Sequence, residues 1–334
     1  ILTNNITNFK TFNIMKKLFL FSMAAVGMLL ASCSSDETVE TSPRQDAIQF
    51  KGFVNKSTRA TDLTTASLEA FKVWGVMKKG DVVGKPFVAR DITKTGGEWT
   101  YGTPLVYWEK DYSYSFVALA PNNASYTFAA PENYQEWGNV TFNNGDGTKD
   151  LLYAAKDAGT IAAGACPASV GLTFNHMLSR VRFQFTNGME DGSDIKVTDI
   201  VITNAPSKGV ATLAETLNGI AWTSDTPQAL NFGDITSQVS LTVGRTNHKF
   251  MIPTTEAYTI TFKVTRKHHG VTDTYNHNVT IPSMTMKPGQ SYQFATVIDA
   301  TNVDPEDSLC PIKFTATVED WADYTDTNVV LPTN

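Results

Sequence analysis

The sequence predicts an all-β fold made of β-sandwiches or open barrels. Three observations support this prediction. Apolar residues alternate with polar ones along most of the chain, which is the pattern of strands that bury one face. Glycine, asparagine and proline residues that form tight turns separate these runs at short intervals. The sequence contains neither heptads nor the strand-and-helix rhythm of α/β proteins.

Three runs show the alternation most clearly, and a helix with a period of 3.6 residues could not bury any of them on one face. In each run we expect the apolar set to face a core. The polar set, which includes Arg180, Arg182 and Gln184, is expected to face water. The apolar sets are Val181, Phe183 and Phe185; Tyr258, Ile260, Phe262 and Val264; and Ile312, Phe314, Ala316 and Val318.

Shorter runs of the same kind predict further strands. Turns such as Gly96-Gly97 and His269-Gly270 separate them. In chain order these strands are expected at Ile48–Val54, Ala70–Met77, Trp99–Trp108, Tyr112–Ala120, Leu151–Ala155, Gly171–Phe174, Lys196–Thr203, Gly209–Leu213, Gln238–Val243, Lys249–Ile252, Tyr275–Ile281 and Ser291–Ile298.

Residues 15–32 form a predicted lipoprotein signal peptide. Two lysines precede an apolar run that is too short to span a bilayer comfortably, since a spanning helix needs about 20 apolar residues. The run ends in the segment Leu30 to Cys33, which resembles a bacterial lipobox. The motif implies cleavage between Ser32 and Cys33, with a lipid anchor on Cys33. The alternative is a removable signal followed by an incidental cysteine. Residues 1–14 precede the first methionine and are interpreted as mis-assigned upstream sequence.

Beyond the signal, composition divides the chain into a tether and two halves. Residues 33–46 are polar and acidic, and we expect them to form a lipidated, flexible tether. The small-residue stretch Ala158–Val170 is the expected joint between the halves. It separates an N-terminal β-sandwich domain at residues 47–168 from a C-terminal one at residues 169–334.

The charge of the mature chain argues against nucleic acid as a partner. Removal of residues 1–32 takes away three lysines and no acidic residue. That leaves 24 basic and 33 acidic side chains and a formal net charge of −9. An acidic surface is unsuited to a phosphate backbone.

The histidines are the first place to look for a metal or a catalytic base. His268 and His269 precede a turn glycine, and His277 would lie across the same hairpin, so a cross-strand pair could hold a metal. No Asp, Glu or Cys at ligand spacing completes such a site, and exposed hairpin histidines explain the pattern better. His176 is typical of a hydrogen-bonded structural histidine.

Other chemistry-bearing patterns are equally sparse. The stretch Asn144 to Gly147 resembles half of a calcium loop, but it lacks the first Asp and the bidentate Glu, so a hairpin turn is the better interpretation. Cys166 and Cys310 could be bridged in an exported protein, and the alternative is two free thiols. No nucleophile elbow, phosphate-binding loop or zinc-protease motif occurs. The sequence therefore predicts no enzymatic activity and no cofactor.

The aromatic residues leave carbohydrate binding open, because sugar rings stack on exposed aromatic faces. Most of them fall on the alternating apolar faces, where packing in a core is the stronger explanation. Four tryptophans are not placed by the pattern: Trp99, Trp108, Trp137 and Trp222.

Six short segments follow the lipobox in a characteristic order. They are Ser57-Thr58-Arg59-Ala60-Thr61, Phe71-Lys72-Val73-Trp74-Gly75, Asp150-Leu151-Leu152-Tyr153-Ala154, Phe174-Asn175-His176-Met177-Leu178-Ser179-Arg180, Pro288-Gly289-Gln290-Ser291-Tyr292 and Val318-Glu319-Asp320-Trp321. The ordered set, which spans nearly the whole mature chain, resembles the fimbrillin family of Bacteroidetes lipoproteins, which build type V pili. The resemblance implies two β-sandwich-like (transthyretin-like) domains in tandem and assembly by strand exchange.

The resemblance also implies where exchange would take place. In the family's stalk subunits, an arginine-specific protease cuts in the loop after the first strand, and Arg59, followed by Ala60, holds that place here. Family members that stay lipid-tethered as anchors or tips can carry a similar sequence uncut, and Arg59 would then be an ordinary loop residue. The displaced strand would present Ile48, Phe50 and Val54 on one face. The incoming donor is expected from the C-terminal end, with Ile312, Phe314, Val318, Val329 and Leu331 as its candidate residues.

The leading prediction is therefore a structural pilus subunit that works in adhesion. Its expected partners are other pilus subunits, either copies of itself or related fimbrillins, together with the outer membrane through the lipid on Cys33 and a host or glycan receptor. It would be a surface-exposed lipoprotein of the outer membrane, and part of the fimbrium if processed. The alternative is a surface glycan-binding lipoprotein of a polysaccharide-uptake system.

Overall fold

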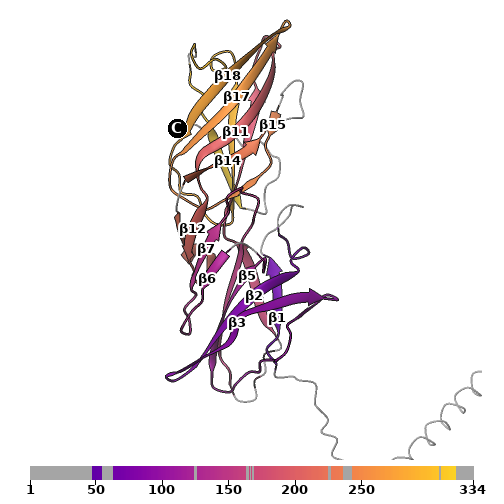
Figure 1. Ribbon diagram of the computed structural model, residues 1–334, viewed down its shortest axis with the longest axis vertical. Helices are drawn as coiled ribbons and strands as arrows, with labels where there is room; N and C mark the ends of the chain where they lie inside the picture. Colours follow the sequence, from indigo (N-terminus) through magenta and orange to yellow (C-terminus); the bar gives the residue numbers. More distant parts are fainter. Residues whose placement is uncertain are drawn as a thin grey trace, which may run out of the picture. The chain divides into compact units, whose positions relative to one another are not determined.

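The computed structural model describes residues 47–54, 63–123, 126–162, 165, 167, 169–224, 227–235, 243–307 and 310–320. In these ranges the chain is built of strands, with a single short 3₁₀ turn at Leu217–Gly219. The prediction of an all-β fold is confirmed (Figure 1). No helix in the described part is long and apolar enough to cross a membrane.

A seven-stranded sheet holds the beginning of the described chain. Its spatial order is β1-β9-β8-β5-β2-β3-β4, so the first strand lies at one edge. All neighbours are antiparallel except β1 and β9, which run parallel. The strands are β1 (Phe50–Val54), β2 (Ala70–Lys79), β3 (Val82–Thr95), β4 (Glu98–Thr100), β5 (Ser113–Ala120), β8 (Leu152–Thr160) and β9 (Val170–His176).

A four-stranded sheet of order β13-β12-β7-β6 combines segments far apart in sequence (Figure 1). Its strands are β6 (Tyr126–Ala129), β7 (Asn139–Asn143), β12 (Lys208–Thr212) and β13 (Ala221–Ser224). Phe142 of β7 and Ala211 of β12 share an apolar core with Trp74 and Leu119 of the seven-stranded sheet. Burial of these side chains between the two sheets holds the sheets together.

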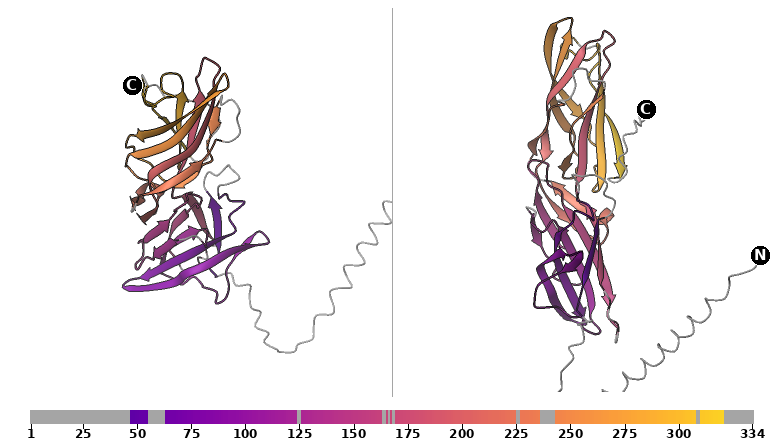
Figure 2. Two further views of the ribbon diagram at one scale, coloured as in Figure 1. Left: turned by 45° about the horizontal axis from the view of Figure 1, so that its top comes forward. Right: turned by 90° about the vertical axis from the view of Figure 1, so that its right-hand side faces the viewer.

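The later part of the chain forms a sandwich. One sheet has the order β14-β11-β17-β18, and the other has the order β15-β10-β19-β20, with β16 also pairing with β10. The right-hand view of Figure 2 shows them as two layers. Their strands are β10 (Ser179–Asn187), β11 (Asp194–Pro206), β14 (Pro227–Gly233), β15 (Val243–Arg245), β16 (Lys249–Met251), β17 (Tyr258–His268), β18 (Val271–Ile281), β19 (Gln290–Ile298) and β20 (Thr315–Asp320).

The clearest alternating run behaves as predicted. Tyr258, Ile260, Phe262 and Val264 of β17 are all buried in the core of the sandwich. The turn that follows β17 is also as expected, because His269 and Gly270 both have positive φ (48° and 84°), which a tight two-residue hairpin turn requires.

The polar face of β10 corrects the prediction, because Arg180, Arg182 and Gln184 are 1%, 4% and 8% exposed and do not face water. β10 lies inside its sheet, between β19 and the short strands β15 and β16. Hydrogen bonds across strands give these buried side chains partners: Arg180 Nε donates to Ser291 Oγ at 2.9 Å, and Arg182 Nε donates to Gln293 Oε1 at 2.7 Å. A buried strand can therefore be polar on one face if its neighbours supply partners.

The predicted strand boundaries need further corrections. β20 begins at Thr315, so Ile312 precedes the strand, and Val318 is 44% exposed instead of facing the core. The run Trp99–Trp108 is a strand only as far as Thr100, and Pro104, which has no N–H to donate, lies in the irregular part. The pattern missed β3, β6, β7, β13 and β14, and most of the predicted run Gln238–Val243 lies outside the described residues.

The sheets also bear on the predicted division into domains. β9 begins at Val170, just beyond the predicted end of the first domain at residue 168, and pairs with β1 and β8 of the first sheet. β12 and β13, from well beyond that point, complete the sheet of β6 and β7. The division at residues 168 and 169 stays a prediction.

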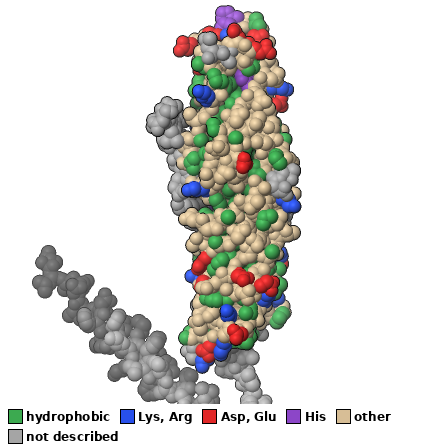
Figure 3. All heavy atoms as spheres, turned by 90° about the vertical axis from the view of Figure 1, so that its left-hand side faces the viewer, with side chains coloured by type: hydrophobic (Ala, Val, Ile, Leu, Met, Phe, Trp, Pro, Cys, Tyr) green, Lys and Arg blue, Asp and Glu red, His purple; other side chains and the backbone are tan. Residues whose placement is uncertain are grey.

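On the face drawn in Figure 3, charged side chains gather near the two ends, and the surface between them carries few.

Candidate functional site

The first strand is the place where sequence and structure together point to a function. β1 alternates strictly: Phe50, Gly52 and Val54 point inward, while Lys51 and Phe53 point outward. Phe50 is 3% exposed, whereas Phe53, of the same residue type, is 50% exposed. Ile48, just before the strand, is fully buried in the same core as Phe50 and Val54. The one-sided apolar face expected for this segment is therefore present.

β1 is held by the backbone of β9. The two strands run parallel, with Phe50 opposite Val170 and Val54 opposite Phe174. The N–H of Val170 donates to the carbonyl oxygen of Gln49 at 2.7 Å. Because β1 is the last strand of its sheet, its removal would leave β9 as a new edge whose N–H and C=O groups can pair with another strand.

Two side chains fix the ends of β1 through its backbone. At the start, the Tyr101 hydroxyl donates to the carbonyl oxygen of Ile48 at 2.8 Å, and the N–H of Ile48 donates to the carbonyl oxygen of Val106 at 2.8 Å. At the other end, the N–H of Val54 donates to Thr65 Oγ1 at 2.9 Å, and the Thr65 hydroxyl donates to the carbonyl oxygen of Val54 at 3.3 Å. Nothing in the alternation of the sequence pointed to Thr65 or Tyr101.

The inward face of β1 packs against a group of aromatic rings, called the aromatic bed below: Phe71, Phe87, Tyr101, Phe116 and Phe174. The ring centroid of Phe50 lies 5.1 Å from that of Phe87 and 5.5 Å from that of Phe116, both edge to face, and 6.3 Å from that of Tyr101. Edge-to-face contacts of this kind stabilise a core beyond the burial of area alone. Phe50 is therefore the main apolar anchor of the strand.

Gly52 meets the same bed at closer range. A Cβ atom at this position would lie 3.0 Å from Phe71 Cε1, 3.4 Å from Phe174 Cε2 and 3.5 Å from Leu68 Cδ2. Phe71 is fully buried, and its ring centroid lies 4.8 Å from that of Trp99 and 5.0 Å from that of Phe174. At this position the aromatic side chains therefore pack directly against the backbone of β1.

The proposed processing sites lie outside the described residues. These are Ser32 and Cys33 for signal cleavage and lipidation, and Arg59 and Ala60 for protease cleavage. All four stay predictions. In the sequence, Arg59 lies between the end of β1 at Val54 and the first core residue after it, Leu68.

The candidate donor residues have different surroundings. Ile312 is buried in the core of the sandwich, and Phe314 packs against it with its ring centroid 5.7 Å from that of Phe183. Val318 belongs to β20, which pairs with β19 of the same chain. Val329 and Leu331 lie outside the described residues.

Two histidines, His176 and His277, take buried structural positions. His176 Nδ1 lies 2.8 Å from Asp150 Oδ2, and both side chains are almost fully buried. His277 stacks on Phe262 with ring centroids 5.0 Å apart, and its Nε2 lies 3.1 Å from the carbonyl oxygen of Val303. Burial lowers the pKa of His277.

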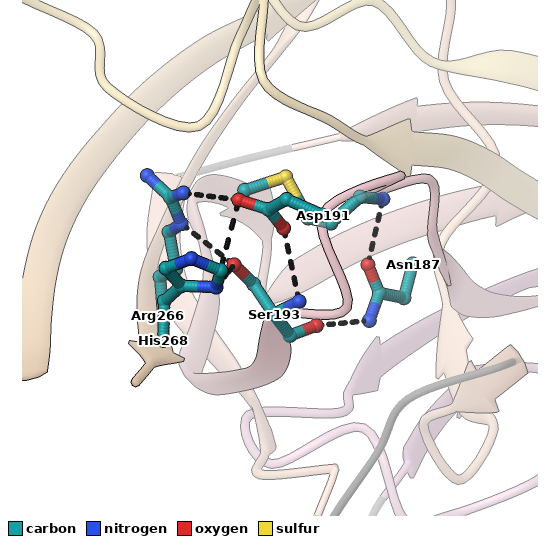
Figure 4. Close-up of polar contacts among 6 residues, drawn as sticks. Asn187, Asp191, Ser193, Arg266 and His268 are labelled. Carbon is teal, nitrogen blue, oxygen red and sulfur yellow. Dashed lines mark hydrogen bonds and ion pairs between the residues drawn. The ribbon is translucent and has the colours of Figure 1, made fainter. Parts of the chain in front are cut away.

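The hairpin end carries one polar cluster, drawn in Figure 4. Arg266 binds the carboxylate of Asp191 and donates from Nε to Ser193 Oγ at 3.0 Å, while His268 Nδ1 lies 3.1 Å from the same oxygen. The side chain and backbone N–H of Ser193, together with Arg266, lower the pKa of Asp191. Asn187 donates from Nδ2 to the carbonyl oxygen of Ser193. The cluster fastens one loop to the hairpin, and His277 is not part of it.

The stretch Asn144 to Gly147, which resembles half of a calcium loop, forms a turn that is held by its own hydrogen bonds. Asp146 Oδ1 accepts hydrogen bonds from the N–H and hydroxyl of Thr148, and the carbonyl oxygen of Asp146 accepts one from Lys249 Nζ at 2.8 Å. The Asn144 side chain donates to the carbonyl oxygen of Phe250. These bonds fasten the turn to β16. Within the described residues no group of three or more His, Cys, Asp or Glu side chains is placed to hold a metal ion.

The remaining chemical candidates can also be placed. Cys310 is exposed, and Cys166 lies outside the described residues, so a bridge between them is untested. The tryptophans that the pattern left open pack against apolar cores: Trp99 and Trp108 against that of the first sheet, and Trp137 and Trp222 against that below β7 and β12.

Comparison with known proteins identifies the fold. A fimbrial protein from Bacteroides vulgatus is similar over 83% of this chain and 99% of its own, with 16% identity and a TM-score of 0.57. A protein from Parabacteroides distasonis, provisionally described as a cell adhesion protein, is similar over 84% of this chain and 98% of its own, with 11% identity and a TM-score of 0.50. No curated protein matches the chain. The profile of a fimbrillin-like family matches residues 58–321, which is most of the sequence, and the chain therefore belongs to the fimbrillin-like family.

Proposed function

We propose that this chain is a structural subunit of a cell-surface pilus, joined to its neighbours when a strand of another subunit replaces β1. Membership of the fimbrillin-like family supports the pilus role, a location at the cell surface and a structural task instead of a catalytic one. The observation that carries strand replacement is the position of β1. It is an edge strand near the start of the fold, with an apolar face seated in the core.

The energetics favour refilling of the site. Ile48, Phe50 and Val54 are each nearly or fully buried. Full burial of such a side chain is worth about 1.5–3 kcal/mol, so loss of all three would cost roughly 5–9 kcal/mol. The backbone groups of β9 would also lose their partners. An incoming strand recovers both terms by β-augmentation.

The sequence of events follows the chain. The lipid on Cys33 holds the exported protein at the outer membrane until cleavage after Arg59 separates β1 from the fold. Tyr101, Thr65 and β9 all follow Arg59 in sequence, so each stays with the fold and can bind the new strand. A chain that remains uncut at Arg59 would keep its lipid and serve as a tethered anchor or tip.

The described surroundings narrow the choice of donor. Ile312 and Phe314 pack in the core of their own sandwich, so their release would disrupt that core. The donor is therefore better placed after β20, where Val329 and Leu331 are two residues apart in the sequence, the spacing of residues on one face of a strand. Truncation after Asp320 should then abolish polymer formation without unfolding the subunit.

Limited digestion tests the role of Arg59. The full-length chain, an Arg59→Ala variant and an Arg44→Ala variant are treated with an arginine-specific protease and run on gels in sodium dodecyl sulfate without heating. Arg44 precedes β1, so a cut there leaves β1 attached to the fold. Wild type and Arg44→Ala should form a ladder of polymers, whereas Arg59→Ala should stay monomeric.

Two results would count against the proposal. One is polymer formation by Arg59→Ala at the wild-type rate. The other is assembled material whose N-terminus is still the acylated Cys33 throughout the stalk.

A further inference from the structure

We infer that the groove left by removal of β1 excludes larger side chains of an incoming strand at one position, the position that Gly52 now fills. The occupant is a strand of another pilus subunit whose inward-facing residues run large, large, glycine and medium, as Ile48, Phe50, Gly52 and Val54 do. This inference rests on the proposed strand exchange and goes beyond it, because it states which strands the groove accepts.

The contacts at the two ends of the groove cannot distinguish one incoming strand from another. The hydroxyl groups of Tyr101 and Thr65 bind backbone atoms of Ile48 and Val54, and β9 pairs with the backbone of β1. Every strand carries these N–H and C=O groups, whatever its side chains. Selection must therefore come from the inward side chains, which meet the aromatic bed.

At the Phe50 position a smaller apolar residue would lose buried contacts but would not clash. At the Gly52 position any larger side chain meets other atoms. The nearest atoms belong to Phe71, Phe174 and Leu68, at 3.0 Å, 3.4 Å and 3.5 Å from the place of a Cβ. Phe71 cannot move away easily, because it is fully buried and its ring packs against those of Trp99 and Phe174. Added atoms in a filled core force the neighbours into strained positions.

The constraint is local and does not apply to every glycine of the sheet. Gly171 lies on β9, opposite Lys51 and next to the partner of Gly52, and a Cβ there would meet nothing within 4 Å. A substitution at Gly171 reduces the backbone entropy lost on folding, as a substitution at Gly52 does, but its new side chain would not contact the aromatic rings. This gives a matched control on the neighbouring strand.

The size restriction at the Gly52 position, called the size filter below, also applies to the chain's own C-terminal segment. If Val329 and Leu331 took the places of Ile48 and Phe50, the Gly52 position would receive Thr333 in one strand direction and Thr327 in the other. Threonine adds a branched side chain where even a Cβ atom requires Phe71 to shift. The segment should therefore bind this groove less tightly than a strand with glycine at that position.

Peptide competition tests the filter. The full-length chain is cleaved at Arg59, unfolded in urea and refolded with an excess of a labelled peptide that carries residues 47–55. Matching peptides have Gly52→Ala, Gly52→Val or, as an outward-facing control, Phe53→Ala. We expect the alanine peptide to bind about tenfold and the valine peptide about a hundredfold more weakly than the glycine peptide. The Phe53→Ala peptide should bind within about twofold of the original.

A second variant tests the cause. Phe71→Leu in the acceptor chain opens space at the Gly52 position, so it should raise binding of the alanine peptide relative to the glycine peptide. Gly171→Ala in the acceptor should leave the ranking of the peptides unchanged.

The outcomes separate the two proposals. If glycine, alanine and valine peptides bind equally, or if Phe71→Leu does not raise the affinity of the alanine peptide relative to the glycine peptide, the size filter is overturned while strand exchange stands. If no peptide binds, including the original one, both the filter and the proposed exchange at this groove are overturned.

Discussion

Phe50 offers the most direct measure of how firmly the first strand is seated. In the intact chain, Phe50→Ala removes a ring that is 3% exposed and lies within 5.5 Å, centroid to centroid, of both Phe87 and Phe116. Truncation of a buried phenylalanine costs about 3–5 kcal/mol, since both the transfer of the ring and the cavity left behind contribute. We expect the variant to lose stability in that range.

The same strand supplies the control. Phe53→Ala is the same chemical change three residues further on, but Phe53 faces outward and is 50% exposed. Its loss should cost less than about 1 kcal/mol. The comparison holds residue type, strand and backbone pairing fixed, so any difference reports on the face of the strand.

Two assays read the outcome. Urea denaturation followed by far-ultraviolet circular dichroism gives the stability of each variant. Hydrogen exchange with mass spectrometry gives the protection of β9, whose amides should exchange faster in Phe50→Ala because β1 opens more often. Equal denaturation midpoints for Phe50→Ala and Phe53→Ala, with unchanged protection of β9, would refute the view that β1 is seated through its inward face.

Three further predictions concern single contacts. Tyr101→Phe removes the hydroxyl that donates to the carbonyl oxygen of Ile48, and it should cost about 1 kcal/mol in urea denaturation; a stability equal to wild type would contradict this. Burial lowers the pKa of His277, so NMR titration should give a pKa below 6.5. The stabilisation that comes from the neutral ring should be complete above pH 6.5 and should decline as the pH falls. A pKa at or above 6.5 would contradict this. Hydrogen bonds from Ser193 lower the pKa of Asp191, so its carboxylate stabilises the fold at pH values above the unfolded-state pKa of about 4 and ceases to do so in acid. The difference in melting temperature between wild type and Asp191→Asn should therefore be present at neutral pH and vanish on strong acidification.

These contacts also indicate why a strand can be both stable and replaceable. β1 pairs with one neighbouring strand, β9, so its exchange disturbs one ladder and, just before the strand, the hydrogen bond from Ile48 to Val106. Its ends are held by side chains that bind backbone atoms, and these would bind an incoming strand equally well. Stability then depends chiefly on the inward side chains, which are the part that differs between strands.

The sequence by itself determined the class of structure and the inward face of β1. Alternation over Tyr258 to Val264 and over Phe50 to Val54 reports directly that one face of each strand is buried, because side chains in a strand point to opposite sides in turn. The same local rule placed the turn at His269-Gly270, where two positive φ angles are needed.

Tertiary structure alone decided which strands are neighbours. Alternation does not say that β1 runs parallel to β9, more than a hundred residues further along, or that β12 joins β7. For the same reason it mistook Arg180 for a solvent-facing residue, because its partner Ser291 comes from a distant strand.

The candidate site was divided in the same way. Ile48, Phe50 and Val54 could be chosen from their period, whereas Thr65 and Tyr101 bind backbone atoms that no side-chain pattern records. The physical reason is that burial leaves a local trace in the sequence, while the pairing of two distant segments depends on contacts that exist only once the chain has folded.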